Sequence, residues 1–555
     1  MRRSVKRILA LFLMGIICLT ACSVKEENPV SKTTEPAVTT SQETDDYPYA
    51  QPLNMLDDNY RTYYEVFVYS FCDGNGDGIG DLEGLISKLD YLNDGDDTTD
   101  TDLGYTGIWL MPIMPSTTYH KYDVTDYYNI DSEYGTLEDF KELIVECDKR
   151  GINVIIDFVM NHTSIKHPWF VKAREYLNAL PEGEEPDLTE CPYVGYYNFS
   201  YGEQGKGVYA QLDDTNWYYE CTFWDQMPDL NLDNPEVRTE FERIVDFWME
   251  LGVSGFRMDA AKEYFSGRSS KNIEVLSWFN SYVKIKDESA YIVAEVWEDS
   301  STYMQYYQSG IDSVFNFDFS QNEGSIGKTI ISSATKAKQF EEDLLKNQQK
   351  INENTDHGID ASFFTNHDVA RAVGYFAYNE EKIKMAAGMN LMMSGCTFTY
   401  YGEEIGLTGS GIDENKRAPM YWNDSGEGMT TGPVNRESQK NRFPSEEEQS
   451  KDPLSIYSYY KRAVRLRNEN PEIARGTIAP ISEVTDEEIC AITKTYNEST
   501  LIMLYNISEE EKTVTLSKDT YGYEGIRGYL SATGEKVTIN GDTVTLPAYA
   551  IAILK

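Results

Sequence analysis

Basic residues are scarce in this sequence. Its 49 Lys and Arg stand against 92 Asp and Glu, and the formal net charge is −43. A nucleic-acid backbone or an anionic membrane surface is bound through basic patches, so this composition argues against both partners and leaves neutral or cationic ligands. Hydrophobic residues make up 41% of the chain and aromatic residues 13%, which excludes a disordered protein.

Apolar runs long enough to span a bilayer are not evident either. The apolar stretch 8–19 is too short for that, and it follows a basic start and ends near Cys22. Residues 1–21 are therefore predicted to be a signal peptide. The segment 19–22 resembles a bacterial lipoprotein signal, which implies cleavage before Cys22, lipidation of its thiol and anchoring at the extracellular face of the cell membrane. An ordinary secretory signal cut after Ala21 is the alternative.

Cysteines are few, and their spacing is not that of a metal site. Cys191 and Cys221 could form a disulfide in an exported protein, and the other cysteines are expected to be buried as small hydrophobic residues. Residues 22–51 are rich in Thr, Ser, Glu and Pro without an apolar period, which predicts a disordered stalk. Six cysteines follow Cys22, at positions 72, 147, 191, 221, 396 and 490.

The 555 residues exceed what one hydrophobic core usually supports, so two or three domains are expected. From about Tyr63 short β-branched or aromatic runs alternate with longer amphipathic stretches, including candidate helices at 136–149 and 235–251. Eight such units predict an α/β fold, a closed (β/α)8 TIM barrel. The candidate strands lie near 64–71, 107–111, 153–158, 255–258, 291–296, 313–317, 361–364 and 398–401.

Two segments depart from this alternation. After the third strand, residues 162–225 are rich in Pro, Gly, Asp and aromatic residues, and they are too many for an ordinary loop, which predicts an inserted small domain. Residues 468–555 contain period-two runs separated by Gly, Asn and Asp, which predicts a C-terminal antiparallel β-sandwich. The barrel is then expected to comprise 52–161 and 226–467.

Four of the predicted strands end in polar residues, within 157–162, 255–260, 294–297 and 363–368. The C-terminal ends of barrel strands are where such folds keep their chemistry. Cleavage of a glycosidic bond needs one carboxylic acid and one carboxylate, and Asp259 and Glu295 fit these two parts, with Asp368 as a third carboxylate. Strand alternation places Arg257 on the same face as Asp259, where we expect it to hold that carboxylate ionised.

These motifs resemble those of the α-amylase superfamily, glycoside hydrolase family 13, over nearly all of the chain from Tyr63 onward. The resemblance implies that Asp259 is the nucleophile, Glu295 the acid/base and Asp368 the residue that stabilises the transition state. It also implies sugar contacts for His162 and His367 and support of the nucleophile by Arg257.

Further segments extend the resemblance. The segment 120–123 is similar to one that lays a tyrosine against the sugar, which implies substrate contacts for His120, Tyr122 and Asp123. Lys262 matches a lysine that binds sugar beyond the cleavage point. The segment 227–231 is intermediate between the oligo-1,6-glucosidase and neopullulanase branches, and Ala260 resembles members that act on α-1,4 bonds. The segment 417–422 resembles one from the glucosidase branch.

Residues 73–81 alternate oxygen-bearing side chains with glycines directly after the first strand, a spacing that wraps oxygens around a hard cation. An EF-hand would need a Glu at the twelfth position, where Gly84 stands. The family resemblance implies a Ca²⁺ loop, and a Gly-Asp turn without metal is the alternative. The implied ligands are Asp73, Asn75, Asp77, the carbonyl of Ile79 and Asp81.

The sequence thus predicts a lipid-anchored, retaining, endo-acting α-amylase that hydrolyses α-1,4 bonds of starch and malto-oligosaccharides. An exo-acting α-glucosidase or a neopullulanase-like enzyme is the alternative within the same chemistry. Two other classes are a non-catalytic glucan-binding lipoprotein and a transporter-associated accessory chain. The three carboxylates at 259, 295 and 368 argue against both.

Overall fold

The structure is a computed structural model that describes residues 53–202, 207–331, 336–437 and 439–555. The predicted signal peptide and stalk lie outside the described residues. Within the described ranges, every helix is too short or too polar to traverse a bilayer.

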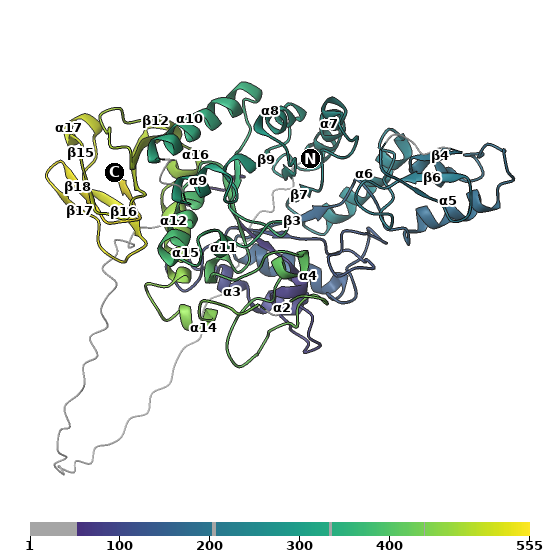
Figure 1. Ribbon diagram of the computed structural model, residues 1–555, viewed down its shortest axis with the longest axis horizontal. Helices are drawn as coiled ribbons and strands as arrows, with labels where there is room; N and C mark the ends of the chain where they lie inside the picture. Colours follow the sequence, from purple (N-terminus) through teal and green to yellow (C-terminus); the bar gives the residue numbers. More distant parts are fainter. Residues whose placement is uncertain (1–52, 203–206, 332–335, 438) are drawn as a thin grey trace, which may run out of the picture. The chain divides into compact units, whose positions relative to one another are not determined.

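Eight parallel strands close into a barrel, which confirms the predicted fold class (Figure 1). Going round the barrel, the strands follow the order β1-β11-β10-β9-β8-β7-β3-β2, and β2 pairs again with β1. Each strand overlaps one of the predicted runs, although β1 and β11 each begin two residues earlier than predicted. The strands are β1 (Thr62–Val66), β2 (Gly107–Leu110), β3 (Asn153–Phe158), β7 (Gly255–Met258), β8 (Tyr291–Ala294), β9 (Ser313–Asn316), β10 (Ala361–Phe363) and β11 (Cys396–Tyr400).

The first strand is shorter than predicted. The apolar run 64–71 is not one strand: β1 ends at Val66, and residues 68–71 form a short helix, α1 (Val68–Phe71). All four residues of α1 are buried. A short, mostly apolar run shows that a segment is buried but not whether it is strand or helix, and this is the reason for the error.

Large side chains fill the barrel interior. The Tyr63 ring stacks on the rings of Tyr291 and Phe398, with centroids 5.3 and 4.9 Å apart. Gly107 makes room for this stack, because a Cβ at that position would lie 2.4 Å from the Tyr63 ring. The interior is therefore a packed core, and polar chemistry is left to the strand ends.

The helices follow the strands and cover the barrel. Thr136 begins α4 with a capping box in which its hydroxyl and the Asp139 side chain each bond the other's backbone N–H, and the Asn234 side chain caps the start of α6. The helices are α2 (Leu82–Ser87), α3 (Leu89–Leu92), α4 (Leu137–Lys149), α5 (Pro168–Ala179), α6 (Pro235–Glu250), α7 (Ser269–Lys286), α8 (Ser300–Tyr303), α9 (Ser325–Ile331), α10 (Ala337–Asn354), α11 (Ala372–Tyr375), α12 (Glu380–Leu391), α13 (Asp413–Lys416), α14 (Glu446–Gln449), α15 (Ile456–Glu469), α16 (Glu472–Arg475) and α17 (Lys518–Tyr521), with 3-10 turns η1 (Pro192–Tyr196), η2 (Met304–Ser309), η3 (Phe317–Phe319) and η4 (Glu403–Ile405).

Two groups of antiparallel strands accompany the barrel. Between β3 and α6, a three-stranded sheet contains β4 (Phe199–Tyr201), β6 (Trp217–Glu220) and β5 (Tyr209–Gln211) in that order. At the C-terminus a five-stranded and a three-stranded sheet share a hydrophobic core, as the sequence predicts. Their strands are β12 (Thr477–Pro480), β13 (Ile489–Tyr496), β14 (Ser499–Asn506), β15 (Lys512–Thr515), β16 (Ile526–Ser531), β17 (Thr538–Asn540), β18 (Thr543–Leu546) and β19 (Ala550–Leu554).

Two buried cations join the C-terminal sheet and α15 to the turn that leads into β11. Lys494 of β13 donates to the carbonyl of Met392 in this turn at 2.9 Å and to that of Ile473 in α16 at 2.7 Å. Arg467 of α15 donates to the carbonyls of Leu391 and Met393. Burial holds the pKa of Lys494 well below its ordinary value. These contacts fix the end of α12 and hence the start of β11.

The six described cysteines are all buried and free. The disulfide considered between Cys191 and Cys221 is therefore not formed, whereas the expectation of buried cysteines is correct.

Candidate active site

Arg257 of β7 connects three carboxylates from three neighbouring strands. Its Nη1 lies 2.9 and 3.0 Å from the two oxygens of Asp157 and 2.6 Å from Oδ1 of Asp259. Its Nη2 lies 2.8 Å from Oε2 of Glu295, which also accepts the Ala260 N–H at 3.1 Å. The guanidinium is 1% exposed and lies 5.0 Å from the Trp109 ring, so these ion pairs are shielded from water.

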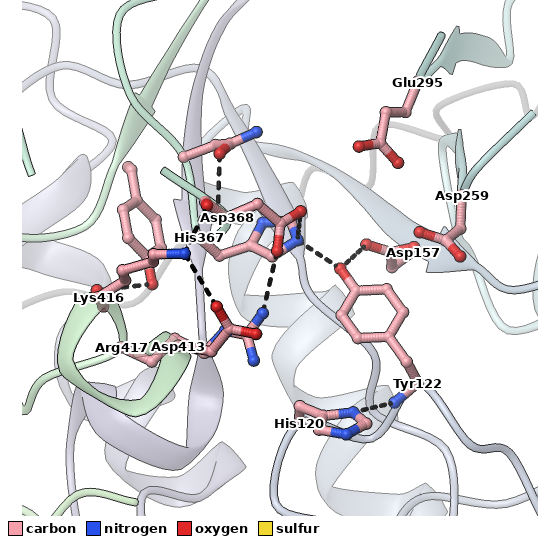
Figure 2. A network of polar contacts seen from close by, with 12 residues as sticks. His120, Tyr122, Asp157, Asp259, Glu295, His367, Asp368, Asp413, Lys416 and Arg417 are labelled. Atoms are coloured by element: carbon pink, nitrogen blue, oxygen red, sulfur yellow. Dashed lines mark hydrogen bonds and ion pairs between the residues drawn. The ribbon is translucent and has the colours of Figure 1, made fainter. Parts of the chain in front are cut away.

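Arg257 contacts Asp259, as predicted, and contacts Glu295 as well, so it does not distinguish the two carboxyl groups. Burial raises the pKa of both carboxyl groups, and Arg257 opposes the rise in both. The two groups face the same cation from adjacent strand ends, so their environments alone do not assign the acid and the nucleophile. Figure 2 shows the two carboxylates side by side at the barrel rim.

A second network surrounds Asp368. His367 Nε2 lies 3.0 Å from Asp368 Oδ2, and Arg417 Nη2 lies 3.1 Å from Asp368 Oδ1. Burial opposes ionisation of Asp368, but the charges of His367 and Arg417 outweigh it and hold the Asp368 pKa well below its usual range. Asp368 is therefore ionised near pH 7.

Tyr122 joins the two networks (Figure 2). Its hydroxyl donates to Asp157 Oδ2 at 3.0 Å and lies 2.8 Å from His367 Nε2, and its ring stacks on the His367 ring. His120 supports Tyr122 by accepting its backbone N–H at Nδ1, 3.1 Å away. Burial lowers the pKa of His120 to about 4, so this imidazole is neutral near pH 7 and free to accept that bond.

Asp123 was predicted to contact substrate, but its carboxylate turns into its own loop. Asp123 is fully buried and accepts hydrogen bonds from the hydroxyls of Ser116, Thr117, Thr118 and Ser164. The position beside Tyr122 shows that Asp123 is near the site but not which way its side chain points. Asp123 is thus a residue that shapes the loop under Tyr122.

His162 lies at the junction of the barrel and the inserted segment. The residue is 2% exposed, its Nε2 has no hydrogen-bond partner, and burial lowers its pKa to about 4. A buried polar atom without a partner is costly unless a ligand completes it. The neighbouring Asn161 donates to Asp229 Oδ1 at 3.2 Å, so the segment 227–231 is tied directly to the end of β3.

Lys262 lies apart from the buried networks. Its side chain is 32% exposed and its Nζ is 3.0 Å from Glu298 Oε1 and 3.6 Å from Glu263 Oε1. Lys262 is therefore partly exposed and has no contact to Asp259 or Glu295 among the described interactions, and its contact with sugar stays a prediction.

Three buried residues of the site were not assigned a part from the sequence: Glu65, Asp157 and Arg417. Asp157 was noted only as the start of a polar strand end, and Glu65 lies inside the apolar run of β1. Arg417 was left without a role, although its neighbours matched a known segment. A charged residue within an apolar strand is the signal that marks Glu65 and Asp157, because an unpaired charge is rarely buried.

The loop 73–81 has the oxygen donors that a calcium ion prefers. Side-chain oxygens bend the loop by accepting its own N–H groups: Asp73 from Gly76 and Gly78 at 2.6 and 2.8 Å, and Asp77 from Ile79 at 2.8 Å. Among the described residues, no three Asp, Glu, His or Cys side chains gather into a metal site. The fit to calcium therefore depends on the mixed set of carboxylates, the Asn75 amide and the Ile79 carbonyl.

Asp81 has a second part in this loop. Its carboxylate caps α2 by accepting the Gly84 N–H at 2.6 Å and also accepts the N–H groups of Gly74 and Asn75. Asp81 is 4% exposed, in contrast to the exposed Asn75 and Asp77. Asp81 thus ties the loop 73–81 to the start of α2.

Glu403 supports the backbone just before Asp368. Its Oε1 accepts the Thr365 N–H at 3.1 Å, and Tyr460 donates to its Oε2 at 3.3 Å. Glu403 is 4% exposed, and burial raises its pKa from 4.5 to about 8. Between these two pKa values Glu403 is protonated in the folded protein but ionised in the unfolded chain, so its contribution to stability falls as pH rises.

We expect Glu403→Gln to weaken the decline of stability between pH 5 and 8. Each pH unit in which Glu403 is protonated only in the folded state costs about 1.4 kcal/mol of unfolding free energy, and the amide has no such dependence. Urea unfolding of wild type and variant at four pH values measures this difference. The exposed Glu83→Gln is the control, and its unfolding free energy should depend on pH as that of the wild type does. A pH dependence of Glu403→Gln parallel to that of the wild type would refute the raised pKa of Glu403.

Comparisons with known proteins give consistent results. Residues 65–476 match the family model described as alpha amylase, catalytic domain. The chain is 37% identical to alpha-amylase 3 of Dictyoglomus thermophilum over 460 residues, covering 82% of this chain and 86% of that protein. It is 31% identical to the oligo-1,6-glucosidase of Parageobacillus thermoglucosidasius, covering 80% and 90%.

Solved structures agree with these matches. Eubacterium rectale Amy13B superposes with a TM-score of 0.88 at 46% identity and covers 92% of this chain and 98% of its own. The alpha-amylase from H. orenii superposes with a TM-score of 0.77 at 35% identity, covering 90% and 99%.

Proposed function

Because this chain belongs to the alpha-amylase family of glycoside hydrolases, we propose that it is a retaining, endo-acting α-amylase that hydrolyses α-1,4 bonds of starch and malto-oligosaccharides. The observation that carries the proposal is the cluster in which Arg257 contacts both Asp259 and Glu295 at adjacent strand ends. A retaining reaction needs two carboxyl groups near one sugar carbon, one on each side of the bond that breaks.

In the proposed reaction, Glu295 gives its proton to the glycosidic oxygen while Asp259 attacks the anomeric carbon. The bond between that carbon and the leaving oxygen breaks, and a covalent glycosyl-enzyme forms. Glu295 then takes a proton from water, which attacks the same carbon and releases Asp259. Two inversions leave the product in the α configuration of the substrate.

Arg257 and Asp368 have different parts in this proposal. Arg257 stabilises whichever carboxylate is ionised. In the first step Glu295 becomes ionised as Asp259 becomes an ester, so the total charge of the two groups beside Arg257 does not change. Asp368 stays ionised because His367 and Arg417 flank it, so it offers a fixed negative charge to the positive character that develops on the sugar ring. Tyr122 offers its ring face to the sugar.

An exo-acting α-glucosidase and a neopullulanase-like enzyme are the two alternatives within the family, and their products differ from those of an endo-acting α-amylase. Similarity to two proteins named alpha-amylase supports the endo-acting enzyme, and similarity to oligo-1,6-glucosidases supports the exo-acting one. We favour α-1,4 endo-cleavage on these identities and on Ala260, which follows the proposed nucleophile.

The size of the first products separates these activities. We expect the full-length protein to convert amylose early into oligosaccharides of mixed length. Glucose as the sole early product would instead establish an exo-acting α-glucosidase. Release of panose from pullulan would indicate a neopullulanase-like enzyme, and binding of amylose without cleavage would indicate a glucan-binding lipoprotein.

We also propose that Cys22 is lipidated and anchors the enzyme at the extracellular face of the bacterial cell membrane. The basic start, the short apolar stretch and the residues before Cys22 support this proposal. Cys22→Ser should release the protein from the membrane fraction, and a variant that stays membrane-bound would contradict the anchor.

Calcium is proposed as the occupant of the loop 73–81. Asp73, Asn75, Asp77, the Ile79 carbonyl and Asp81 would hold it, and its charge would brace the loop without entering the reaction. We expect Ca²⁺ at about 100 times its dissociation constant to raise the unfolding free energy by about 2.7 kcal/mol. Asp77→Ala should lose most of this gain, whereas the exposed Asp96→Ala should retain it. Equal calcium effects in both variants would contradict the site.

A further inference from the structure

Each nitrogen of the His367 ring faces an oxygen atom. Nδ1 lies 2.6 Å from Oε1 of Glu65 in β1. Nε2 lies 2.8 Å from the Tyr122 hydroxyl and 3.0 Å from Oδ2 of Asp368. Both His367 and Glu65 are 1% exposed, so water does not complete these contacts.

The number of protons in this network decides which of its atoms donate and which accept. A neutral imidazole has one N–H, and its other nitrogen can only accept. Tyr122 has one hydroxyl proton, which it donates to Asp157 at 3.0 Å. Asp368 is paired through Oδ1 with Arg417 Nη2 at 3.1 Å, which favours its anion, and the anion has no proton to give. His367 Nε2 therefore needs its own proton, and the short contact between Nδ1 and Glu65 needs another.

We infer that Glu65 is a positioning residue that keeps His367 doubly protonated, so that the imidazolium holds Asp368 ionised and in place. The inference rests on the proposed function, because it gives a part in that reaction to a residue of the first strand. Glu65 acts through His367 and contacts neither Asp259 nor Glu295 among the described interactions.

The charges around His367 favour its doubly protonated, positively charged form. Arg257 and Arg417 are the neighbouring positive groups, and the acidic groups outnumber them, so a third positive charge reduces the imbalance. Burial alone would lower the His367 pKa, but Asp368 and Glu65 outweigh burial and raise it to about 10. The titratable and charged groups facing this site are Glu65 from β1, Tyr122 after β2, Asp157 from β3, Arg257 and Asp259 at β7, Glu295 after β8, Asp368 beside His367, and Tyr400 and Arg417 at and after β11.

The protonation of His367 can be read directly. The chain has only five histidines, so ¹⁵N labelling of histidine in the full-length protein gives few ring signals, and His367→Gln identifies the one from His367. At pH 8 an ordinary histidine is neutral, whereas we expect both nitrogens of His367 to carry protons. An unprotonated nitrogen in the wild type would overturn the inference, including the case in which Glu65 holds the proton. This spectrum needs no variant at position 65.

Glu65→Gln then tests the part of the carboxylate. The amide keeps the shape and accepts from Nδ1 but carries no charge. We expect the His367 titration to move down by about one pH unit or more. Because the effect reaches the reaction through Asp368, we expect kcat on maltotriose to fall about tenfold or more with little change in KM, the scale on which orienting partners of a histidine act.

Glu404→Gln is the matched control. Glu404 is equally buried and accepts from the hydroxyls of Tyr64 and Tyr91 at 2.6 Å, on the other face of β1. We expect the His367 signal and the kcat of the Glu404→Gln variant to match those of the wild type. An unshifted titration in Glu65→Gln, or an equal shift in Glu404→Gln, would overturn the inference. A doubly protonated His367 in a protein that cleaves no glucan would instead refute the proposed function and leave the Glu65 pairing intact.

Discussion

Asp259→Asn is expected to reduce hydrolysis of amylose by about four orders of magnitude or more while leaving amylose binding intact. The amide cannot attack the anomeric carbon, and loss of a nucleophile that acts together with its acid removes most of the rate enhancement. Asn still accepts a hydrogen bond from Arg257, so the buried cluster keeps its shape. Initial rates of reducing-end release and binding by affinity electrophoresis measure the two properties separately.

Asp360→Asn is the control for this substitution. Asp360 is a buried aspartate just before β10, at the opposite end of the barrel from Asp259, where it accepts from the side chains of Asn316 and Asn347. We expect this variant to retain amylase activity even if its stability falls. Unchanged hydrolysis by Asp259→Asn would remove Asp259 from the reaction.

Arg257→Met is expected to abolish activity and to lower the unfolding free energy by about 3–5 kcal/mol, because removing one partner of a buried ion pair leaves uncompensated charge. Asp157, Asp259 and Glu295 would all lose the guanidinium. Burial already raises the pKa of Asp157 to about 7, and without Arg257 the carboxyl pKa values rise further.

The sign of the pH effect follows from this rise. Carboxyl groups whose folded pKa exceeds the unfolded value favour the folded state at low pH and lose that contribution as pH rises. Arg257→Met should therefore be closer to the wild type at pH 5 than at pH 8 in denaturant unfolding. Arg257→Lys keeps the charge but not the two-pronged geometry, so it should recover stability more than activity. Equal losses at both pH values for Arg257→Met would contradict the ion-pair account.

The barrel could be predicted because its strands are short apolar runs that alternate with amphipathic stretches, and four of them end in polar residues. Runs such as 153–158 and 255–258 coincide with β3 and β7. The first strand was misjudged because the apolar run continues through Phe67 into α1, and burial alone does not distinguish the two conformations. The predicted helix 136–149 agrees with α4 and its N-cap Thr136, whose capping box with Asp139 is a local interaction.

The site was predicted less completely, because side-chain direction and convergence are properties of the folded barrel. Asp259 and Glu295 stand next to recognisable strand ends, and the structure brings both to Arg257. Glu65 and His367 are 302 positions apart and meet only when β1 and β10 both pair with β11, which lies between them. Asp123 was predicted to contact substrate, but its position in the chain does not show that its carboxylate accepts hydrogen bonds from three neighbouring hydroxyls.

The configuration of the first sugar released tests the central claim most directly. We would follow maltotriose hydrolysis by ¹H NMR from the first minutes, before mutarotation equilibrates the anomers, and assign the newly formed reducing end. Two successive displacements at one carbon predict that the α anomer appears first and the β anomer only later. A β anomer formed first would mean a single displacement by water and would contradict the assignment of Asp259 as a nucleophile.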